Sequence, residues 1–460
     1  MAETKRIGRR IEPFVDGFLI DKLDGVRREL QHPERREVVL TCDAPWESEI
    51  VGFTSIVQLE DRIRLYYRAS TDRVLGEDFQ CIAIAESFDG GFRFERPSLG
   101  LVEYDGSRDN NLIASGEQPT VPPPFLDTNP ACREDERFKG LTSKWRKLWA
   151  MTSADGLSWR LMRDRELDMA GTFDTINTAF WDSKIGAYRS FTRFFRDVNF
   201  GAEEVDLLGA DTVAVRSIQS STSPDFIEWT EPTPHTYNDS HDYTQLYTNA
   251  TVPCPGAEHL YLSFPNRYVQ HRILDRGHEH PGVNDALFMC SRDATRWNRY
   301  LEAWVRPGLD AYNWTERNNY PVWGIVETSD VEWSIFVSEH YRRPGVPVRL
   351  RRLAIRPYGF ISLRGDYDGG RVRTHPFEFT GEDLFINAST SAAGGIRVSV
   401  LDEHGRDIDG YGSSDMEEFF GDSVDARIRW GEKRLGSLAL RPIRLSISLC
   451  DADLFAIRAG

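Results

Sequence analysis

Short runs of apolar or alternating residues recur along the whole chain, and long segments with the 3.6-residue period of a helix are scarce. The runs are about four to eight residues long and rich in β-branched and aromatic side chains, as is typical of strands. Representative runs read CIAIAES, KLWAMTS and ALFMCS. This pattern predicts an all-β protein.

Four of these runs end in the same corner, in which Ser-x-Asp is followed by an aromatic residue. A short Asp side chain can accept backbone N–H bonds in a tight turn, and the aromatic residue then begins the next strand. Successive serines lie 66, 70 and 68 residues apart, and such a near-constant period indicates a repeated structural unit. The corners are Ser87-Phe88-Asp89 with Phe94, Ser153-Ala154-Asp155 with Trp159, Ser223-Pro224-Asp225 with Trp229, and Ser291-Arg292-Asp293 with Trp297.

Two further strand-like runs lie between successive corners, so each unit has four predicted strands. Four-stranded units arranged radially form a β-propeller. A fifth unit fits after residue 318, although it carries Arg356-Pro357-Tyr358-Gly359 in place of the corner. The strands after about residue 370 are interpreted as a separate β-sandwich. The sequence thus predicts a wrapping segment over residues 1–45, a five-bladed β-propeller catalytic domain over 46–369, and a C-terminal β-sandwich domain over 370–460.

The charge balance narrows the class of partner. The 460 residues carry 56 Lys and Arg against 72 Asp and Glu, a formal charge of −16. Binding to nucleic-acid phosphates is not expected, because it needs clustered basic residues. No run of 18 apolar residues occurs, and the N-terminus lacks the apolar core of a secretory signal. We therefore expect a cytoplasmic protein without a membrane partner, and leave self-association as a homo-oligomer open.

The sequence lacks motifs for cofactors and metals. Its six cysteines stand far apart, without the CxxC spacing of a zinc or redox site, and are interpreted as structural. No glycine motif for binding phosphates or dinucleotides is present. His271, His278 and His280 share one loop but lack the spacing of a metal site. We expect neither a cofactor nor a metal.

Acidic and amide residues recur where the innermost strands of a propeller would meet at one mouth of the central channel. Glu47 enters the first inner strand, Asp174 opens the third, and Glu339 ends the second strand of unit five. Glycosyl transfer needs converging acids, because one carboxylic acid protonates the leaving oxygen while a second carboxylate activates water or attacks the sugar. A solvated loop end is the alternative interpretation of each acid. Further candidates at this mouth are Glu49, Asp109, Asn111, Asp285 and Asn319.

Three arginines stand at corresponding places, each at the end of a second strand: Arg68, Arg193 and Arg267. A guanidinium there could bind sugar hydroxyls, a carboxylate or a phosphate through its fork of donors. Structural salt bridges are the alternative. Aromatic residues at the same mouth, Tyr247 among them, could stack on the apolar faces of sugars.

The repeated corners followed by a sandwich resemble the five-bladed propeller glycosidases, the group that contains the fructan hydrolases and the arabinan-acting enzymes. The chain also resembles bacterial proteins described as glycosidase-like, through the stretches DGVRREL, SLGLVEYDGSRDNNLI, LYTN, VWGIVET and DADLF. In those glycosidases an Asp on blade one, an Asp on blade two and a Glu on blade three act as nucleophile or base, transition-state helper and acid. This chain departs from that pattern, since its first inner strand offers Glu47 or Glu49 and its third offers Asp174.

The resemblance implies a glycoside hydrolase that cleaves a small oligosaccharide or a furanoside. We predict that Asp174 and Glu339 carry the acid and base work and that Glu47 assists. Two alternatives stay open: a sialidase-like or phosphate-using glycosidase, which the arginines would favour, and a sugar-binding propeller without catalysis. The residues predicted to hold the small carbohydrate substrate are Asp109, Asn111, Asp285, Arg68, Arg193, Arg267, Tyr247 and Asn319.

Overall fold

Strands dominate the computed structural model, which describes residues 3–71, 79–117, 121–144, 147–197, 214–241 and 243–460. The all-β class is therefore confirmed. The helices among the described residues are single 3-10 turns, and none has the length and apolar character needed to cross a membrane. They are η1 (Glu134–Glu136), η2 (Ala311–Asn313) and η3 (Leu435–Leu438).

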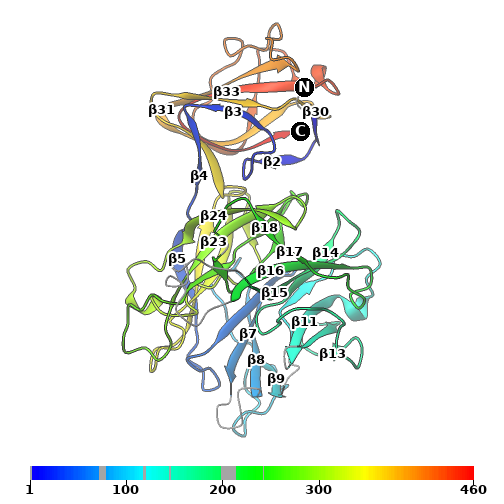
Figure 1. The fold of residues 1–460 in the computed structure, drawn as a ribbon, viewed down its shortest axis with the longest axis vertical. Coiled ribbons are helices and arrows are strands. Elements are labelled where there is room, and N and C mark those ends of the chain that lie inside the picture. The colour runs from blue at the N-terminus through cyan, green and yellow to red at the C-terminus, as the bar shows by residue number, and fades with distance from the viewer. Residues whose placement is uncertain (1–2, 72–78, 118–120, 145–146, 198–213, 242) are drawn as a thin grey trace.

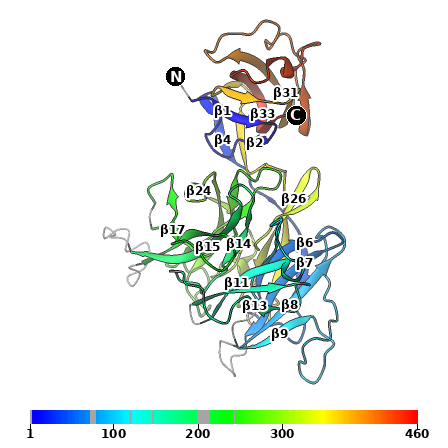
Figure 2. The same ribbon diagram turned by 90° about the vertical axis from the view of Figure 1, so that its right-hand side faces the viewer.

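Four four-stranded sheets make up most of the propeller-like part of the molecule (Figures 1 and 2). Within each sheet, strands that follow one another along the chain pair in antiparallel fashion, as the sequence predicts for blades. The first is β6 (Gly52–Gln58), β7 (Ile63–Thr71), β8 (Phe79–Ser87) and β9 (Leu112–Glu117); the second is β10 (Pro124–Leu126), β11 (Phe138–Lys144), β12 (Lys147–Ser153) and β13 (Arg160–Leu161); the third is β14 (Thr178–Asp182), β15 (Ala187–Asp197), β16 (Ala214–Ser223) and β17 (Thr233–Pro234); the fourth is β25 (Val326–Ser329), β26 (Glu332–Glu339), β27 (Arg349–Ile355) and β5 (Glu34–Thr41).

The segment between the third and fourth of these sheets forms seven strands instead of the predicted four. One reason is Pro265, which lies between β21 and β22 and has no backbone N–H to continue a ladder. Among the described residues the structure thus holds four blade-type sheets, not the five expected. The seven strands are β18 (Thr236–Tyr237), β19 (Gln245–Leu246), β20 (Val252–Pro253), β21 (Tyr261–Ser263), β22 (Asn266–Val269), β23 (Val283–Ser291) and β24 (Arg296–Val305).

The Ser-x-Asp corners are confirmed as turns that bind their own backbone. At the end of β12, the Oδ1 atom of Asp155 accepts hydrogen bonds from Ser153 Oγ at 3.0 Å and from the backbone N–H groups of Leu157 and Ser158 at 2.7 and 2.8 Å. The corners after β8, β16 and β23 repeat this arrangement around Asp89, Asp225 and Asp293. The repeat in the sequence is therefore a repeat of turn chemistry.

The N-terminal residues do not wrap the first blade as expected. Of the described strands before residue 45, only β5 pairs with a strand of the propeller-like part. It pairs with β27 and closes the last sheet. The strands before it pair with C-terminal strands, and Figure 1 shows them in blue beside the orange and red ones. Ile7, Phe14 and Leu19 are buried in the core of that region, which a local reading of the sequence could not reveal.

The C-terminal strands and the first four strands share one ten-stranded sheet. β28 belongs to it, so the run GFISLRG, predicted to end the propeller, pairs instead with β4 and β33. The expected division of the C-terminal region into a two-sheet sandwich stays a prediction. The ten strands are β1 (Lys5–Gly8), β2 (Ile11–Pro13), β3 (Ile20–Asp24), β4 (Val26–Leu30), β28 (Ile361–Gly365), β29 (Gly370–Thr374), β30 (Phe377–Phe379), β31 (Leu384–Asp402), β32 (Asp422–Ile428) and β33 (Ile443–Ala459).

Candidate functional site

A cavity of about 440 Å³ lies where all the sheets of the propeller-like part meet. Its volume falls in the range of about 300–1,000 Å³ that is usual for small-molecule sites. Among the described residues, each of these sheets or the loop before it contributes to the lining. The polar and aromatic lining residues include Thr54, Arg68, Gln80, Thr142, Asp174, Asn177, Tyr247, Arg317, Tyr320, Ser338 and Tyr341.

Asp174 is the carboxylate of this cavity. It lies in the loop before β14, and about half of its side chain (49%) is exposed. The guanidinium of Arg193, on β15 and 4% exposed, donates to its Oδ1 atom. Arg193 also lies over the ring of Tyr247, 5.2 Å from the ring centroid. The structure thus brings together three residues that the sequence predicted for the site.

Arg68 enters the same cavity from β7 with neutral partners. Its Nη2 atom donates to the carbonyl of Ile50 at 3.3 Å and to the hydroxyl of Tyr341 at 3.4 Å. Arg317 donates to the same hydroxyl at 3.2 Å. Arg317 and Tyr341 were not among the residues predicted from the sequence. Each lies two residues from a predicted one, Asn319 and Glu339, and this closeness was the available signal.

Several polar atoms of the lining residues are buried and have no hydrogen-bond partner. Among the described residues these are Nε of Arg68, Oδ1 of Asn177 and the hydroxyl of Tyr320. A buried polar group without a partner costs about 1–3 kcal/mol. A ligand with hydroxyl or acidic groups would satisfy such atoms, which makes the cavity a candidate binding site.

Backbone strain gathers at the rim of the cavity. Arg317 and Asn319 have φ angles of +57° and +58°, and His340 and Arg342 have +67° and +57°. Non-glycine residues in this left-handed region are uncommon and cluster at functional sites. The two segments that carry Arg317 and Tyr341 are therefore held in conformations that local preference does not favour.

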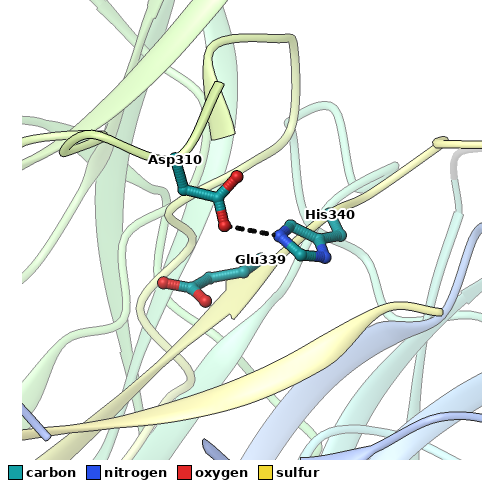
Figure 3. A group of neighbouring side chains, drawn as sticks. All are labelled: Asp310, Glu339 and His340. Atoms are coloured by element: carbon teal, nitrogen blue, oxygen red, sulfur yellow. Dashed lines mark hydrogen bonds and ion pairs between the residues drawn. The ribbon is translucent and has the colours of Figure 1, made fainter. Parts of the chain in front are cut away.

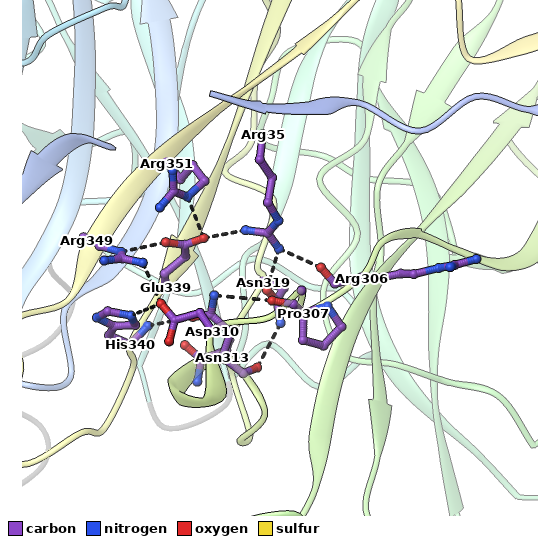
Figure 4. A network of polar contacts seen from close by, with 12 residues as sticks. Arg35, Arg306, Pro307, Asp310, Asn313, Asn319, Glu339, His340, Arg349 and Arg351 are labelled. Carbon is purple, nitrogen blue, oxygen red and sulfur yellow. Dashed lines mark hydrogen bonds and ion pairs between the residues drawn. The ribbon is translucent and has the colours of Figure 1, made fainter. Parts of the chain in front are cut away.

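Glu339 ends β26 but does not line the cavity. Its carboxylate is 1% exposed and accepts hydrogen bonds from Arg349 Nε at 2.7 Å, from Arg351 Nε at 2.8 Å and from Arg35 (Figure 4). Burial acts to raise the pKa of Glu339, but the bonds from Arg351 and Arg349 outweigh it and hold the pKa below its usual value. A carboxylate locked in this way cannot deliver a proton to a leaving group. The predicted acid or base role is corrected to one of joining β5 to β26 and β27.

Asp310, Glu339 and His340 form a cluster of the kind that can hold a metal ion, with one ligand atom of each within 4.8 Å of the others (Figure 3). The ring Nε2 of His340 lies 2.8 Å from Asp310 Oδ2, which also accepts from Arg349 at 2.7 Å. Arginines thus occupy both carboxylates, and their positive charges would repel a cation. These residues do not fit a metal ion.

Glu47 belongs to a second buried network, beneath the first sheet. It accepts from the hydroxyl of Tyr67 at 2.7 Å and from two nitrogens of Arg96 at 3.0 and 2.7 Å. Asn111 donates to the same Tyr67 hydroxyl at 2.7 Å and accepts from Trp46 Nε1 at 2.8 Å. Burial, with the neighbouring Glu47 charge, raises the pKa of Tyr67 well above its ordinary value. The contacts of Glu47 and Asn111 stabilise this network and do not reach the cavity lining.

The other predicted residues also lie outside the lining. Arg267 and Asp285, opposite each other on β22 and β23, form a two-point pair at 2.8 and 2.5 Å. Burial raises the pKa of Asp285 despite Arg267. Asn319 is buried and donates to backbone carbonyls of Asn284 and Asn313 at 3.0 and 3.1 Å. Asp109 is exposed in the loop before β9.

Comparison with known proteins gives structural matches alone. No protein-family model and no curated protein matches the chain. The catalytic domain of an α-L-arabinofuranosidase from Coprinopsis cinerea is 9% identical, with 71% of this chain and 97% of that one covered and a TM-score of 0.43. An N-acetylgalactosamine deacetylase from F. plautii, in complex with blood group B trisaccharide, is 11% identical, with 73% and 97% covered and a TM-score of 0.44.

A further solved structure is described as a glycoside hydrolase. It is 13% identical, with 71% of this chain and 93% of that one covered and a TM-score of 0.44. The solved structures that the chain is similar to thus include proteins described as a glycoside hydrolase and as an α-L-arabinofuranosidase. The overlap is partial in each case, and the function proposed below rests on the residues of this chain.

Proposed function

We propose that the chain is a glycoside hydrolase that binds a small carbohydrate in the central cavity and uses Asp174 as its catalytic carboxylate. The observation that carries this proposal is the placement of Asp174, which lines the cavity, is half exposed and lies beside Arg193. A carboxylate that is open to a ligand can react with it, whereas the carboxylates of Glu47 and Glu339 are enclosed by protein donors.

The surroundings of Asp174 fit the role of a base or a nucleophile. The guanidinium of Arg193 forms an ion pair with the carboxylate. A charged carboxylate can activate water or attack the anomeric carbon. The unpartnered Oδ1 atom of Asn177 offers an acceptor for a sugar hydroxyl.

The finer architecture is part of the same proposal. We take the seven-stranded sheet as the fifth blade, because its residues Tyr247 and Thr248 line the cavity together with residues of the four-stranded sheets. The catalytic domain then runs from β5 to β27, and the ten-stranded sheet is a second domain built from both ends of the chain. We also propose a cytoplasmic location, which the six free cysteines support, since disulfides are rare in reducing compartments.

A sugar-binding protein without catalysis is the second candidate. The observation that favours it is that Asp174 is the single carboxylate among the described lining residues. Glycoside hydrolysis ordinarily uses a pair of carboxyl groups, one as the acid and one as the base or nucleophile. A binding protein needs no such pair.

The test compares wild type, Asp174→Asn and Asp109→Asn on a panel of oligosaccharides, pyranosides and furanosides, with products measured by chromatography. Asp109 is a matched control because it is an exposed aspartate away from the lining. We expect Asp174→Asn to lower turnover by about 10²-fold or more, as loss of an acid–base group does, and Asp109→Asn to leave it unchanged. Equal turnover in wild type and Asp174→Asn would refute the role of Asp174. Tight glycan binding without any product would support the second candidate.

A further inference from the structure

We propose that the cavity binds an oxyanion group of its ligand, a carboxylate or a phosphate, between Arg68 and Arg317. The inference deepens the proposed function, on which it rests for the carbohydrate nature of the ligand. It assigns to the cavity a substrate class, an acidic sugar or a sugar together with phosphate, that the fold alone does not specify.

Arg68 has no acidic partner in the part of the chain that the structure describes. Its hydrogen bonds go to the Ile50 carbonyl and the Tyr341 hydroxyl, at 3.3 and 3.4 Å, and its Nε atom is buried without a partner. Arginine is always charged, so a guanidinium that lines the cavity and has neutral partners among the described residues leaves its positive charge available to a ligand. An oxyanion from a ligand would compensate it.

Arg317 donates to the same Tyr341 hydroxyl and lines the same cavity. Its Nε atom lies 3.2 Å from Glu316, but Glu316 also pairs with Arg342 at 2.9 Å. One carboxylate is thus shared by two guanidiniums. Arg68 and Arg317 therefore both donate to one phenol and keep a surplus of hydrogen-bond donors, because a guanidinium has five N–H donors and no acceptor.

Two more arginines, Arg193 and Arg216, add positive charge around the ring of Tyr247. The guanidiniums of Arg193, Arg216 and Arg317 lie 5.2, 5.3 and 5.6 Å from the centroid of its ring. Arg216 makes its side-chain hydrogen bond to the neutral Gln245, at 2.8 Å. Burial and the nearby charge of Arg193 lower the pKa of Arg216. Nε and Nη1 of Arg193 and Nε of Arg216 are buried donors without a partner among the described residues.

The positive charge of the cavity contrasts with the whole chain, whose formal charge is −16. Among the described residues, Asp174 and Glu316 are the carboxylates that pair with the arginines of this group. The four arginines outnumber these two carboxylates, and an excess of one sign of charge in a cleft concentrates ligands of the opposite sign. The fork of donors on a guanidinium matches the two oxygens of a carboxylate or phosphate. A neutral sugar, like the described partners of Arg68, would bring no negative charge to it.

The experiment is calorimetric titration of the purified chain with galacturonate, galactose and inorganic phosphate, each alone. We expect galacturonate or phosphate to bind and galactose to bind at least tenfold more weakly, with affinity for the anion falling as salt rises. Binding of galacturonate without phosphate would identify the sugar's own acid group as the oxyanion. Binding of phosphate without galacturonate would identify free phosphate. Equal affinity for galactose and galacturonate, or no binding of either anion, would overturn the inference.

The variants Arg68→Gln and Arg317→Gln test whether the oxyanion binds between these two residues. Each should weaken anion binding by about tenfold or more, the scale of a lost charge-assisted hydrogen bond. Arg93→Gln is the matched control, because Arg93 is 75% exposed and outside the cavity lining. Two arginines are tested so that one misfolded variant leaves the other to decide, with folding checked by thermal melting. Unchanged anion binding in both variants, each shown to be folded, would overturn the assignment.

These outcomes separate the inference from the proposed function. Anion binding with no cleavage of any glycan would leave the oxyanion site standing and count against hydrolysis. Cleavage of a neutral oligosaccharide by a chain that binds neither anion would support hydrolysis and count against the oxyanion site. The titration needs no turnover, so it does not depend on finding the substrate first.

Discussion

The hydroxyl of Tyr341 accepts a hydrogen bond from Nη1 of Arg317 at 3.2 Å, and through that bond the loop after β26 is tied to the cavity. The same hydroxyl accepts from Arg68 on β7 at 3.4 Å, so one phenol links the first and last sheets of the propeller-like part. It also sets the separation of the two guanidiniums. Tyr341 is therefore a positioning residue in the oxyanion site proposed above.

Replacing Tyr341 with Phe should weaken binding of galacturonate or phosphate by about threefold to tenfold, the scale of a lost hydrogen bond. The ring packing stays, so the melting temperature should change little. Calorimetric titration gives the affinity, and Tyr367→Phe, at a side chain 71% exposed, is the matched control. Unchanged affinity in Tyr341→Phe would remove the residue from the site.

We predict that Glu339 stabilises the folded protein and that its replacement lowers the free energy of unfolding. Glu339→Gln leaves the guanidiniums of Arg35, Arg349 and Arg351 facing a neutral group at a site 1% exposed. Removing one side of a buried ion-pair network costs about 3–5 kcal/mol. Urea unfolding measures the loss, with Glu95→Gln as the control, since Glu95 is 61% exposed. A variant as stable as wild type but without turnover would restore a catalytic role to Glu339.

We predict that Glu12 makes the free energy of unfolding depend on pH in the acid range. This residue of β2 is 1% exposed and pairs with Arg10 at 2.5 Å and with Arg292, after β23, at 3.0 Å. Burial acts to raise its pKa, but the His259 ring, whose Nε2 atom lies 3.3 Å from the carboxylate, and the charge of Arg292 lower it to about 2, from an ordinary value of 4.5. The folded pKa is therefore below the unfolded one. The stability that the ionised carboxylate contributes is full above pH 4.5 and is lost as the pH falls towards 2.

The measurement is urea unfolding of wild type and Glu12→Gln at several pH values. The difference in unfolding free energy between them should be largest above pH 4.5 and shrink steadily below it. The exposed Glu417→Gln serves as the matched control. A difference that grows on acidification would mean that the sign of the pKa shift is wrong.

Phe14 tests the pairing of the chain ends. The side chain is 1% exposed and packs in the core of the ten-stranded sheet. Phe14→Ala should cost about 3–5 kcal/mol, as large-to-small changes in cores do. Hydrogen exchange should rise in β29 and β33, whereas β6 to β8 should keep their protection. Increased exchange confined to the first blade would instead support a wrapping role for the N-terminus.

Much of the propeller-like part follows from the sequence because its signals are local. Asp155 accepts N–H bonds from residues two and three positions ahead, so the corner can be recognised within a short window. The strand runs before such corners are equally local. The seven-stranded segment was predicted with too few strands, in part because Pro265 interrupts what would have been one continuous strand.

The candidate site was predictable only in part. Asp174, Arg68 and Tyr247 lie where repeat positions place them and line the cavity. Glu339 occupies an equally suggestive position, yet its role depends on Arg35, which is 304 residues away along the chain. The sequence does not say which charges will meet over such a separation.

The sequence by itself determined the all-β class, the repeated corners and the strands that carry the cavity residues, because hydrophobic period and turn chemistry act between near neighbours. The tertiary structure alone decided that β1 to β4 pair with C-terminal strands. It also decided that Glu339 is enclosed while Asp174 is open, and that Arg68 and Arg317 share one phenol. The physical reason is that burial and charge pairing join residues far apart in the chain, and local sequence preference carries no record of them.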